Sequence, residues 1–157
     1  MKQALISLFF VLFSIISIAQ DGALRKKHFN LDDGLALSGY DAVAYLNQSK
    51  AVKGDKHLSL THEGVTYYFA TADNKEEFRR NPSRYEPAYG GWCAYAMGSN
   101  GKKVSVDPKT FKVVNGKLNL FYNKFFNNTL EDWNKDESNL KRKADLNFCT
   151  AEGKTSI

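Results

Sequence analysis

Hydrophobic and polar residues alternate in several short runs that predict β-hairpins. In residues 57–71, HLSLTHEGVTYYFAT, two alternating runs flank Glu63–Gly64, which predicts two strands joined by a turn. FKVV and KLNLFYN alternate in the same way on either side of Asn115–Gly116, a dipeptide typical of tight hairpin turns. KKVSV, residues 102–106, predicts one further strand.

Helical spacing of apolar residues marks the segments between these runs. SGYDAVAYL, residues 38–46, predicts a short helix with Ser38 or Asp41 as its N-terminal cap. NKEEFRR follows Asp73 as an amphipathic helix that ends at Asn81–Pro82, because the residue before a proline disfavours helical backbone.

The second half of the chain adds two more predicted helices. WCAYAM, residues 92–97, is interpreted as a short helix with Gly98 as its C-terminal cap, and a strand is the alternative. From Lys124 to about Asn147 large apolar residues recur at helical spacing, so we expect one C-terminal helical region. Those residues are Phe125, Phe126, Leu130, Trp133 and Leu140. The predicted fold is α+β, with small antiparallel hairpins packed against short helices and a C-terminal helix.

The first residues, MKQALISLFFVLFSIISIAQ, have the composition of a secretory signal peptide. Lys2 precedes an apolar run, and Ser17 and Ala19 are small residues at the positions that a signal peptidase recognises. Cleavage would leave Gln20 at the N-terminus, whereas an uncleaved anchor helix is the alternative. We therefore expect a periplasmic or secreted protein without a stable membrane anchor after cleavage.

Beyond a signal peptide at residues 1–19, the sequence predicts an N-terminal arm at 20–37, one domain at 38–148 and a tail at 149–157. The formal net charge is +5, and removal of Lys2 with the signal peptide leaves +4. The basic residues are interspersed with acids and form no concentrated patch, so we expect no nucleic-acid partner. Paired acids, a phosphate loop and a catalytic triad are not evident, so the sequence gives little reason to expect an enzyme.

Cys93 is the residue with the most chemical options. If its segment is helical, Cys93 and Met97 lie on one face as two soft donors of the kind that bind Cu(I), with His28, His57 or above all His62 as a third ligand. A disulfide with Cys149 is the second option in an oxidising compartment. A reactive thiol and a small buried core residue are the others.

Several blocks of the chain resemble the YHS domain family, and in particular its exported single-domain branch. They are GYDAVAYL, VTYYFATADNKEEFRRNPSRYEPAYGGWCAYAM and VDPKTFKVVNGKLNLFYN, followed by a tryptophan and KADLNF. The resemblance implies a fold related to the metal-binding TRASH modules, whose cysteines hold a metal ion. Laid onto that pattern, those cysteines correspond here to Ala44, Ala70 and Asn74. None of the three supplies a thiolate, so we do not expect the family's usual metal site.

These observations predict an exported binding module. The first hypothesis is a copper site, or else a zinc site, formed by Cys93, Met97 and His62. The alternative is a scaffold without metal that binds a small organic ligand or a protein partner through an aromatic pocket. Tyr40, Asp41, Tyr89 and Trp92 are the expected contacts, and Cys93 is then structural or bonded to Cys149.

Overall fold

The hairpin predicted at residues 57–71 forms as expected. In the computed structural model, which describes residues 22–23 and 25–151, β3 (Asp55–His62) pairs antiparallel with β4 (Val65–Phe69) around Glu63–Gly64. The alternation places Val65, Tyr67 and Phe69 of β4 on a fully buried face. The expected signal peptide, residues 1–19, lies outside the described residues.

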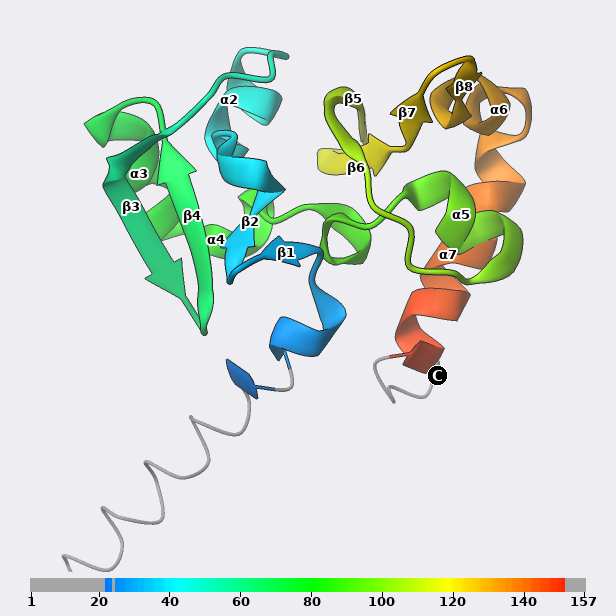
Figure 1. Ribbon diagram of the computed structural model, residues 1–157, viewed down its shortest axis with the longest axis horizontal. Helices are drawn as coiled ribbons and strands as arrows, with labels where there is room; N and C mark the ends of the chain where they lie inside the picture. Colours follow the sequence, from blue (N-terminus) through cyan, green and yellow to red (C-terminus); the bar gives the residue numbers. More distant parts are fainter. Residues whose placement is uncertain (1–21, 24, 152–157) are drawn as a thin grey trace, which may run out of the picture.

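Two short strands complete this sheet from a segment that was expected to be only an arm. β1 (Leu31–Asp32) pairs antiparallel with β2 (Leu35–Ala36), and β2 runs parallel to β4 with Leu35 opposite Thr66. The strand order is therefore β1–β2–β4–β3 (Figure 1). A 3₁₀ turn, η1 (Leu37–Gly39), leads from this sheet into the helix that follows it.

Asp41 begins that helix and links it to two other elements. α2 (Ala42–Asn47) starts where one Asp41 oxygen accepts the amides of Val43 and Ala44, at 2.8 and 3.3 Å. The other oxygen accepts the Ala70 amide at the end of β4 and the side-chain amide of Asn74 in α3 (Ala72–Arg80). Asp41, the second of the two expected caps, thus ties α2 to the sheet and to α3.

The first hydrophobic core lies between the four-stranded sheet and these helices. α4 (Pro82–Tyr85) begins directly after α3, because Asn81–Pro82 ends the longer helix as predicted. Aromatic side chains fill the space: the Phe78 ring lies 4.6 Å from Tyr67 and 5.2 Å from Phe69, centroid to centroid. Such rings bury large areas and can sustain a small core.

The N-terminal segment is fastened to a glycine turn much later in the chain. η2 (Ala88–Gly91) presents the Gly90 carbonyl to the Asn30 amide at 2.8 Å, and the Trp92 indole donates to the His28 carbonyl at 2.9 Å. Gly90 has φ +59°, and a Cβ there would lie 2.4 Å from the His28 oxygen. Only glycine allows this close approach of two backbones.

The predicted turn at Asn115–Gly116 joins β5 (Asp107–Val114) and β6 (Lys117–Phe121). The helix expected in WCAYAM is α5 (Ala94–Asn100), and Cys93 precedes its first turn. Gly98 is not its cap: the helix continues to Asn100, and Gly101 takes the left-handed conformation with φ +71°. Residues 102–106 are irregular rather than a strand, because Val104 bonds back to the Cys93 amide instead of to a strand.

The helical region expected from Lys124 begins later than the spacing predicted. β7 (Asn123–Lys124) and β8 (Asn127–Asn128) form a minimal hairpin with Phe125 and Phe126 in its turn. Asn128 then caps α6 (Thr129–Lys135) by accepting the Leu130 amide at 3.2 Å. α7 (Glu137–Ala151) follows and extends past Asn147 into the expected tail.

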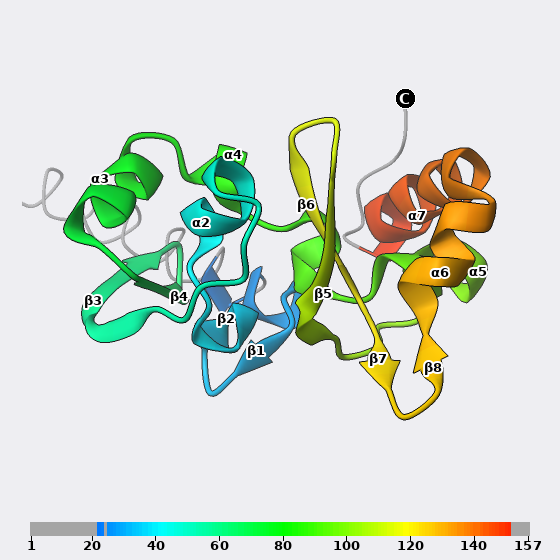
Figure 2. The same cartoon turned by 90° about the horizontal axis from the view of Figure 1, so that it is seen from above.

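A second core gathers α5, α6, α7 and the end of β6. Trp133 is fully buried against Phe121, with ring centroids 5.5 Å apart. Gly98 lets α5 and α7 touch, because a Cβ at Gly98 would lie 2.4 Å from the Leu140 carbonyl oxygen. Figures 1 and 2 show the β3–β4 hairpin at one end of the molecule and these helices at the other, with β5–β6 between them.

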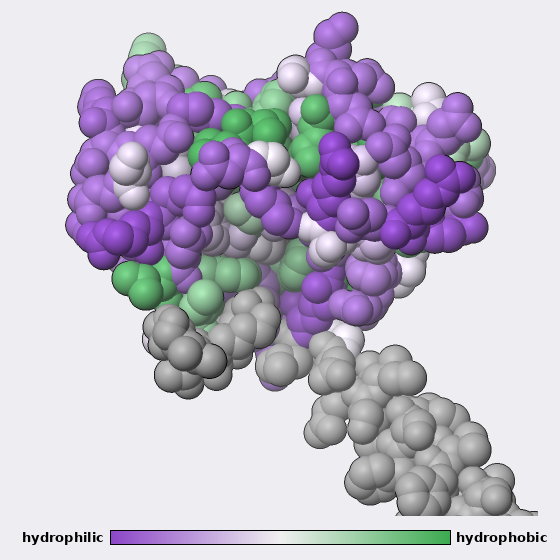
Figure 3. All heavy atoms as spheres, turned by 180° about the vertical axis from the view of Figure 1, so that it is seen from behind, coloured by the Kyte–Doolittle hydropathy of each residue, from purple (hydrophilic) through white to green (hydrophobic). Residues whose placement is uncertain are grey.

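Among the described residues, few large hydrophobic side chains are exposed. The face in Figure 3 is mostly hydrophilic, with hydrophobic residues in small separate patches. Within residues 22–23 and 25–151, no helix combines the length and apolarity that a membrane span requires.

Replacing Asp41 should destabilise the first core. Asp41→Ala removes a helix cap and leaves the Ala70 amide and the Asn74 side chain without their acceptor. We expect the free energy of unfolding to fall by about 3 kcal/mol in urea titrations. Asp73→Ala, an exposed acid in the first turn of α3, is the control and should cost about 0.5 kcal/mol. Equal effects of the two substitutions would contradict the linking role of Asp41.

Gly98→Ala tests the contact between α5 and α7. Alanine favours a helix by about 1 kcal/mol, but its methyl would displace the Leu140 backbone, so we expect a net loss of about 1–2 kcal/mol of unfolding free energy. Ser99→Ala, exposed on the same helix, should be neutral or stabilising in the same thermal scans. A stabilised Gly98→Ala variant would show that the two helices are not in close contact.

Candidate functional site

The three positions that match the YHS cysteines meet around one carboxylate. The Ala44 amide, the Ala70 amide and the Asn74 side chain all donate to Asp41, which is fully buried. The place where the resemblance implies a metal ion therefore holds a hydrogen-bonded carboxylate. Asp41 was also an expected ligand contact, yet both of its oxygens already accept hydrogen bonds from the protein.

Cys93 is buried, and all of its polar groups are paired. Its amide donates to Val104, and its carbonyl accepts the Met97 amide at 3.0 Å. The Tyr122 amide donates to Sγ at 3.4 Å, and Thr129 Oγ1 lies 3.5 Å from Sγ. Because the Thr129 hydroxyl donates to the Tyr122 carbonyl at 2.9 Å, the thiol proton is the one left for the Cys93–Thr129 contact. This geometry suits a protonated thiol that joins α5, β6 and α6.

Of the other two expected metal ligands, Met97 lies one helical turn from Cys93 and His62 lies in a different part of the molecule. Met97 is fully buried in the second core, whereas His62 ends β3, where its ring packs edge-on against Phe78 with centroids 6.3 Å apart. Figures 1 and 2 place β3 and α5 at opposite ends of the molecule. The described part of the chain contains no group of three His, Cys, Asp or Glu side chains suited to holding a metal ion.

Of the four expected ligand contacts, Tyr89 alone lines the cavity between η2, the β5–β6 turn and α7. Tyr40 is half-buried with the Lys53 ammonium 4.6 Å from its ring centroid, and the Trp92 indole is bonded to the N-terminal segment. The structure therefore places Tyr40, Asp41, Tyr89 and Trp92 in four different sets of contacts.

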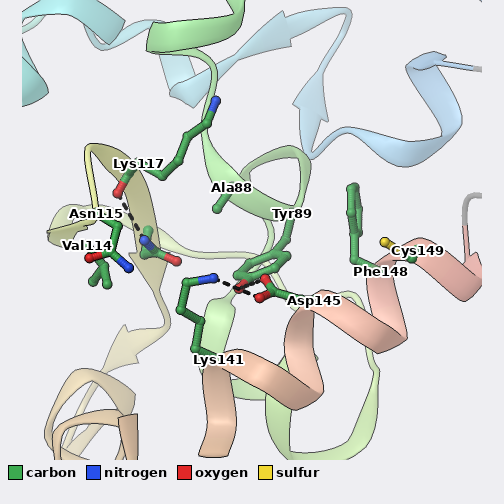
Figure 4. A pocket seen from close by; sticks show the side chains of 10 residues that line it. Ala88, Tyr89, Val114, Asn115, Lys117, Lys141, Asp145, Phe148 and Cys149 are labelled. Carbon is green, nitrogen blue, oxygen red and sulfur yellow. Dashed lines mark hydrogen bonds and ion pairs between the residues drawn. The ribbon is translucent and has the colours of Figure 1, made fainter. Parts of the chain in front are cut away.

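A cavity of about 480 Å³ opens between η2, the β5–β6 turn and the outer face of α7 (Figure 4). One wall is apolar: the Tyr89 and Phe148 rings meet edge to face with centroids 5.9 Å apart, and Ala88 and Val114 adjoin them. Cys149 also lines this cavity, as a free and half-buried thiol. Cys93 and Cys149 are thus separate thiols in different surroundings, and the structure contains no bond between them.

The polar side of the cavity centres on Asp145. Its Oδ1 accepts the Tyr89 hydroxyl at 2.9 Å, and its Oδ2 accepts the Lys141 ammonium at 2.7 Å. Burial, and then the hydrogen bond and charge of Asp145, raise the pKa of the Tyr89 phenol. The phenol therefore stays protonated and holds Asp145 in place throughout the range in which proteins are stable.

Unused donors remain in the cavity beside the carboxylate of Asp145, whose side chain is 49% exposed. Lys141 has three N–H groups and uses one on Asp145, and its side chain is 33% exposed. Asn115 and Asn119 add amide groups to the lining. Lys117 contributes only its stem, because its ammonium points away in Figure 4 and bonds to the Ser83 carbonyl. The cavity thus has one accessible cation beside an apolar wall.

Sequence reasoning missed the α7 side of this site. Lys141, Asp145 and Phe148 lie four and three residues apart, which places them on one helix face. A lysine and an aspartate at that spacing are typical of a solvated surface pair, so the pattern alone did not indicate a site. Only the packing of α7 against η2 turns this face into a cavity wall.

Comparisons with known proteins found no matching family model, no matching curated protein and no matching solved structure. The resemblance to the YHS family therefore stays a prediction from the sequence.

The two thiols should react very differently. We expect iodoacetamide to alkylate Cys149 in the native protein and to modify Cys93 only after unfolding, because Cys93 is fully buried. Mass spectrometry of tryptic peptides after timed labelling measures both rates. A native mass lower by the two hydrogens lost on disulfide formation would instead show that the two cysteines are paired.

Proposed function

We propose that this protein is a binding module for a small amphipathic organic anion, held in the cavity between η2, the β5–β6 turn and α7. The observation that carries the proposal is the pairing of an apolar aromatic wall with one accessible ammonium, that of Lys141. A volume of about 480 Å³ is within the range of small-molecule sites.

The apolar wall favours a ligand with an aromatic or alkyl body. Tyr89 and Phe148 provide ring faces and edges, and Val114 adds a branched aliphatic side chain. A flat ring stacked or packed edge-on against them would bury apolar area from both partners. The site resembles common ligand cavities in which apolar groups dominate and a few polar groups set the orientation.

The polar groups favour an acidic head group. Asp145 is the carboxylate of the site, and both of its oxygens already accept hydrogen bonds from the protein. A cationic ligand at Asp145 would lie beside the Lys141 ammonium and be repelled by it, whereas an anionic ligand can take the N–H groups that Lys141 leaves unused. A carboxylate or sulfonate next to an aromatic body fits this arrangement.

Copper binding at Cys93 is less well supported than this cavity. Cys93 does line a smaller cavity of about 260 Å³, but neither Met97 nor His62 does. The thiol also has hydrogen-bond partners of its own, which a metal ion would have to replace. The proposed YHS scaffold is therefore compatible with a role that uses no metal ion.

A matched pair of fluorescent probes tests the proposed site. 1-Anilinonaphthalene-8-sulfonate is an aromatic anion, and N-phenyl-1-naphthylamine is the same skeleton without its charge. We expect saturable binding of the anion by the native protein and about tenfold weaker binding in Lys141→Ala, because a charge-assisted contact is lost. The neutral probe should bind both proteins alike.

Two further variants locate the binding. Phe148→Ala removes part of the apolar wall and should weaken both probes. Lys117→Met keeps a stem of similar length and removes only the ammonium, which points away from the cavity, so it should change neither. Circular dichroism and thermal midpoints check that each variant is folded. Wild-type affinity for both probes in Lys141→Ala and Phe148→Ala would exclude this cavity as the site.

A further inference from the structure

The tip of the β7–β8 hairpin carries two adjacent phenylalanines that lie almost wholly in solvent. Phe125 is 96% exposed and Phe126 is 107% exposed. The other large hydrophobic side chains on the described surface are far less exposed, with Leu146 at 44% and Val113 at 37%. Scattered exposed apolar groups are normal, but a fully exposed aromatic pair at one point of the surface indicates a contact with another surface.

The backbone at this tip does not favour large residues. Lys124 pairs with Asn127, so Phe125 and Phe126 are the two connecting residues of a tight hairpin. Phe125 has φ +55°, a conformation that glycine and asparagine adopt easily and a bulky aromatic residue rarely does. Neither side chain belongs to either core of the described chain. Fold stability therefore does not explain two phenylalanines at this turn.

The strands that lead to the tip carry lysines, and the acid that adjoins the hairpin is Glu131, which accepts the Asn128 side-chain amide. Residues 108–130 include Lys109, Lys112, Lys117 and Lys124 and contain no aspartate or glutamate. Lys112 forms an ion pair with Glu137, and Lys117 lies by the β5–β6 turn, at the opposite side of the molecule from the β7–β8 tip in Figure 2. β7 lies beside β5, where the Asn123 side chain donates to Thr110 at 3.0 Å. Lys124 directly precedes Phe125, and Lys109 precedes Thr110 in the strand that β7 contacts, so these two lysines lie on the tip's side of β5 and β7.

The shape and size of this tip favour contact with a lipid surface over contact with a second copy of the chain. The hairpin projects from the body in Figure 2. Two exposed phenylalanine side chains present on the order of 400 Å² of apolar area, whereas a stable protein dimer buries about 800 Å² on each partner. Aromatic side chains with neighbouring lysines are suited to the boundary between lipid head groups and acyl chains.

We propose that Phe125 and Phe126 insert reversibly into the surface of an anionic lipid bilayer, with Lys109 and Lys124 contacting the head groups. The contact is peripheral, and it places β7–β8 at the membrane. The cavity beside α7 faces another side of the molecule, so this surface contact is independent of the proposed ligand site.

Vesicle flotation tests the contact. The protein is purified in the form that its producing cell yields, and mass spectrometry defines its N-terminus. It is then mixed with vesicles of phosphatidylcholine alone or of equal parts phosphatidylcholine and phosphatidylglycerol. We expect co-flotation with the anionic vesicles, weakened by added salt. The double variant Phe125→Gly with Phe126→Ser should reduce it at least about tenfold, because both apolar contacts are lost.

The double variant should remain folded, because Gly–Ser suits a tight turn with positive φ at its first residue. Leu146→Ser, which removes an exposed apolar side chain from α7, is the matched control and should float like the wild type. Hydrogen exchange should slow at residues 123–128 when anionic vesicles are added. Equal flotation of the wild type and the double variant would overturn the proposal. The proposal would also fail if the wild type bound no vesicles and light scattering showed a dimer that the double variant cannot form.

Discussion

The two-sided burial of β6 is the constraint on which the rest of the structure depends. Leu118 and Leu120 enter the core under the four-stranded sheet, Phe121 enters the helical core, and Asn119 lines the cavity beside α7. A shift of one residue in the register would exchange these faces and place an amide in the first core. The Asn115–Gly116 turn fixes the register by setting Val114 opposite Lys117. One short strand therefore aligns both cores and the candidate ligand site.

Elements whose causes are local could be predicted from the sequence. The Glu63–Gly64 and Asn115–Gly116 turns and the Asp41 cap each depend on a few adjacent residues, and the structure contains all three. The helical spacing of apolar residues gave a wrong prediction where those residues are not buried. Phe125 and Phe126 fit a helical period with Leu130 and Trp133, but they form a turn because Asn128 starts the helix after them. Gly98 was expected to end a helix, but it lies within α5, where the absence of a side chain allows close contact with α7.

The candidate site was harder to predict because its two walls are far apart in the chain. Tyr89 was identified from its aromatic neighbours, but its partner Asp145 lies 56 residues later, and nothing in the sequence connects the two. Asp41 illustrates the opposite error. Its carboxylate was expected to cap a helix or bind a ligand, and the amides of α2 and Ala70 use the oxygens that a ligand would need. Sequence patterns indicate side-chain chemistry, but only tertiary packing decides which groups stay available.

The attachment of the N-terminal segment to the glycine turn has a consequence for the order of folding. The bonds from Asn30 to Gly91 and from Trp92 to His28 join residues 61 and 64 positions apart. Closing so long a loop carries an entropic penalty that local hairpins do not have, so β3–β4 and β5–β6 are free to form first. The segment that leaves the ribosome early is thus among the last to be fixed. Until residues 90–92 have emerged, His28 and Asn30 lack these partners, although β2 can already pair with β4.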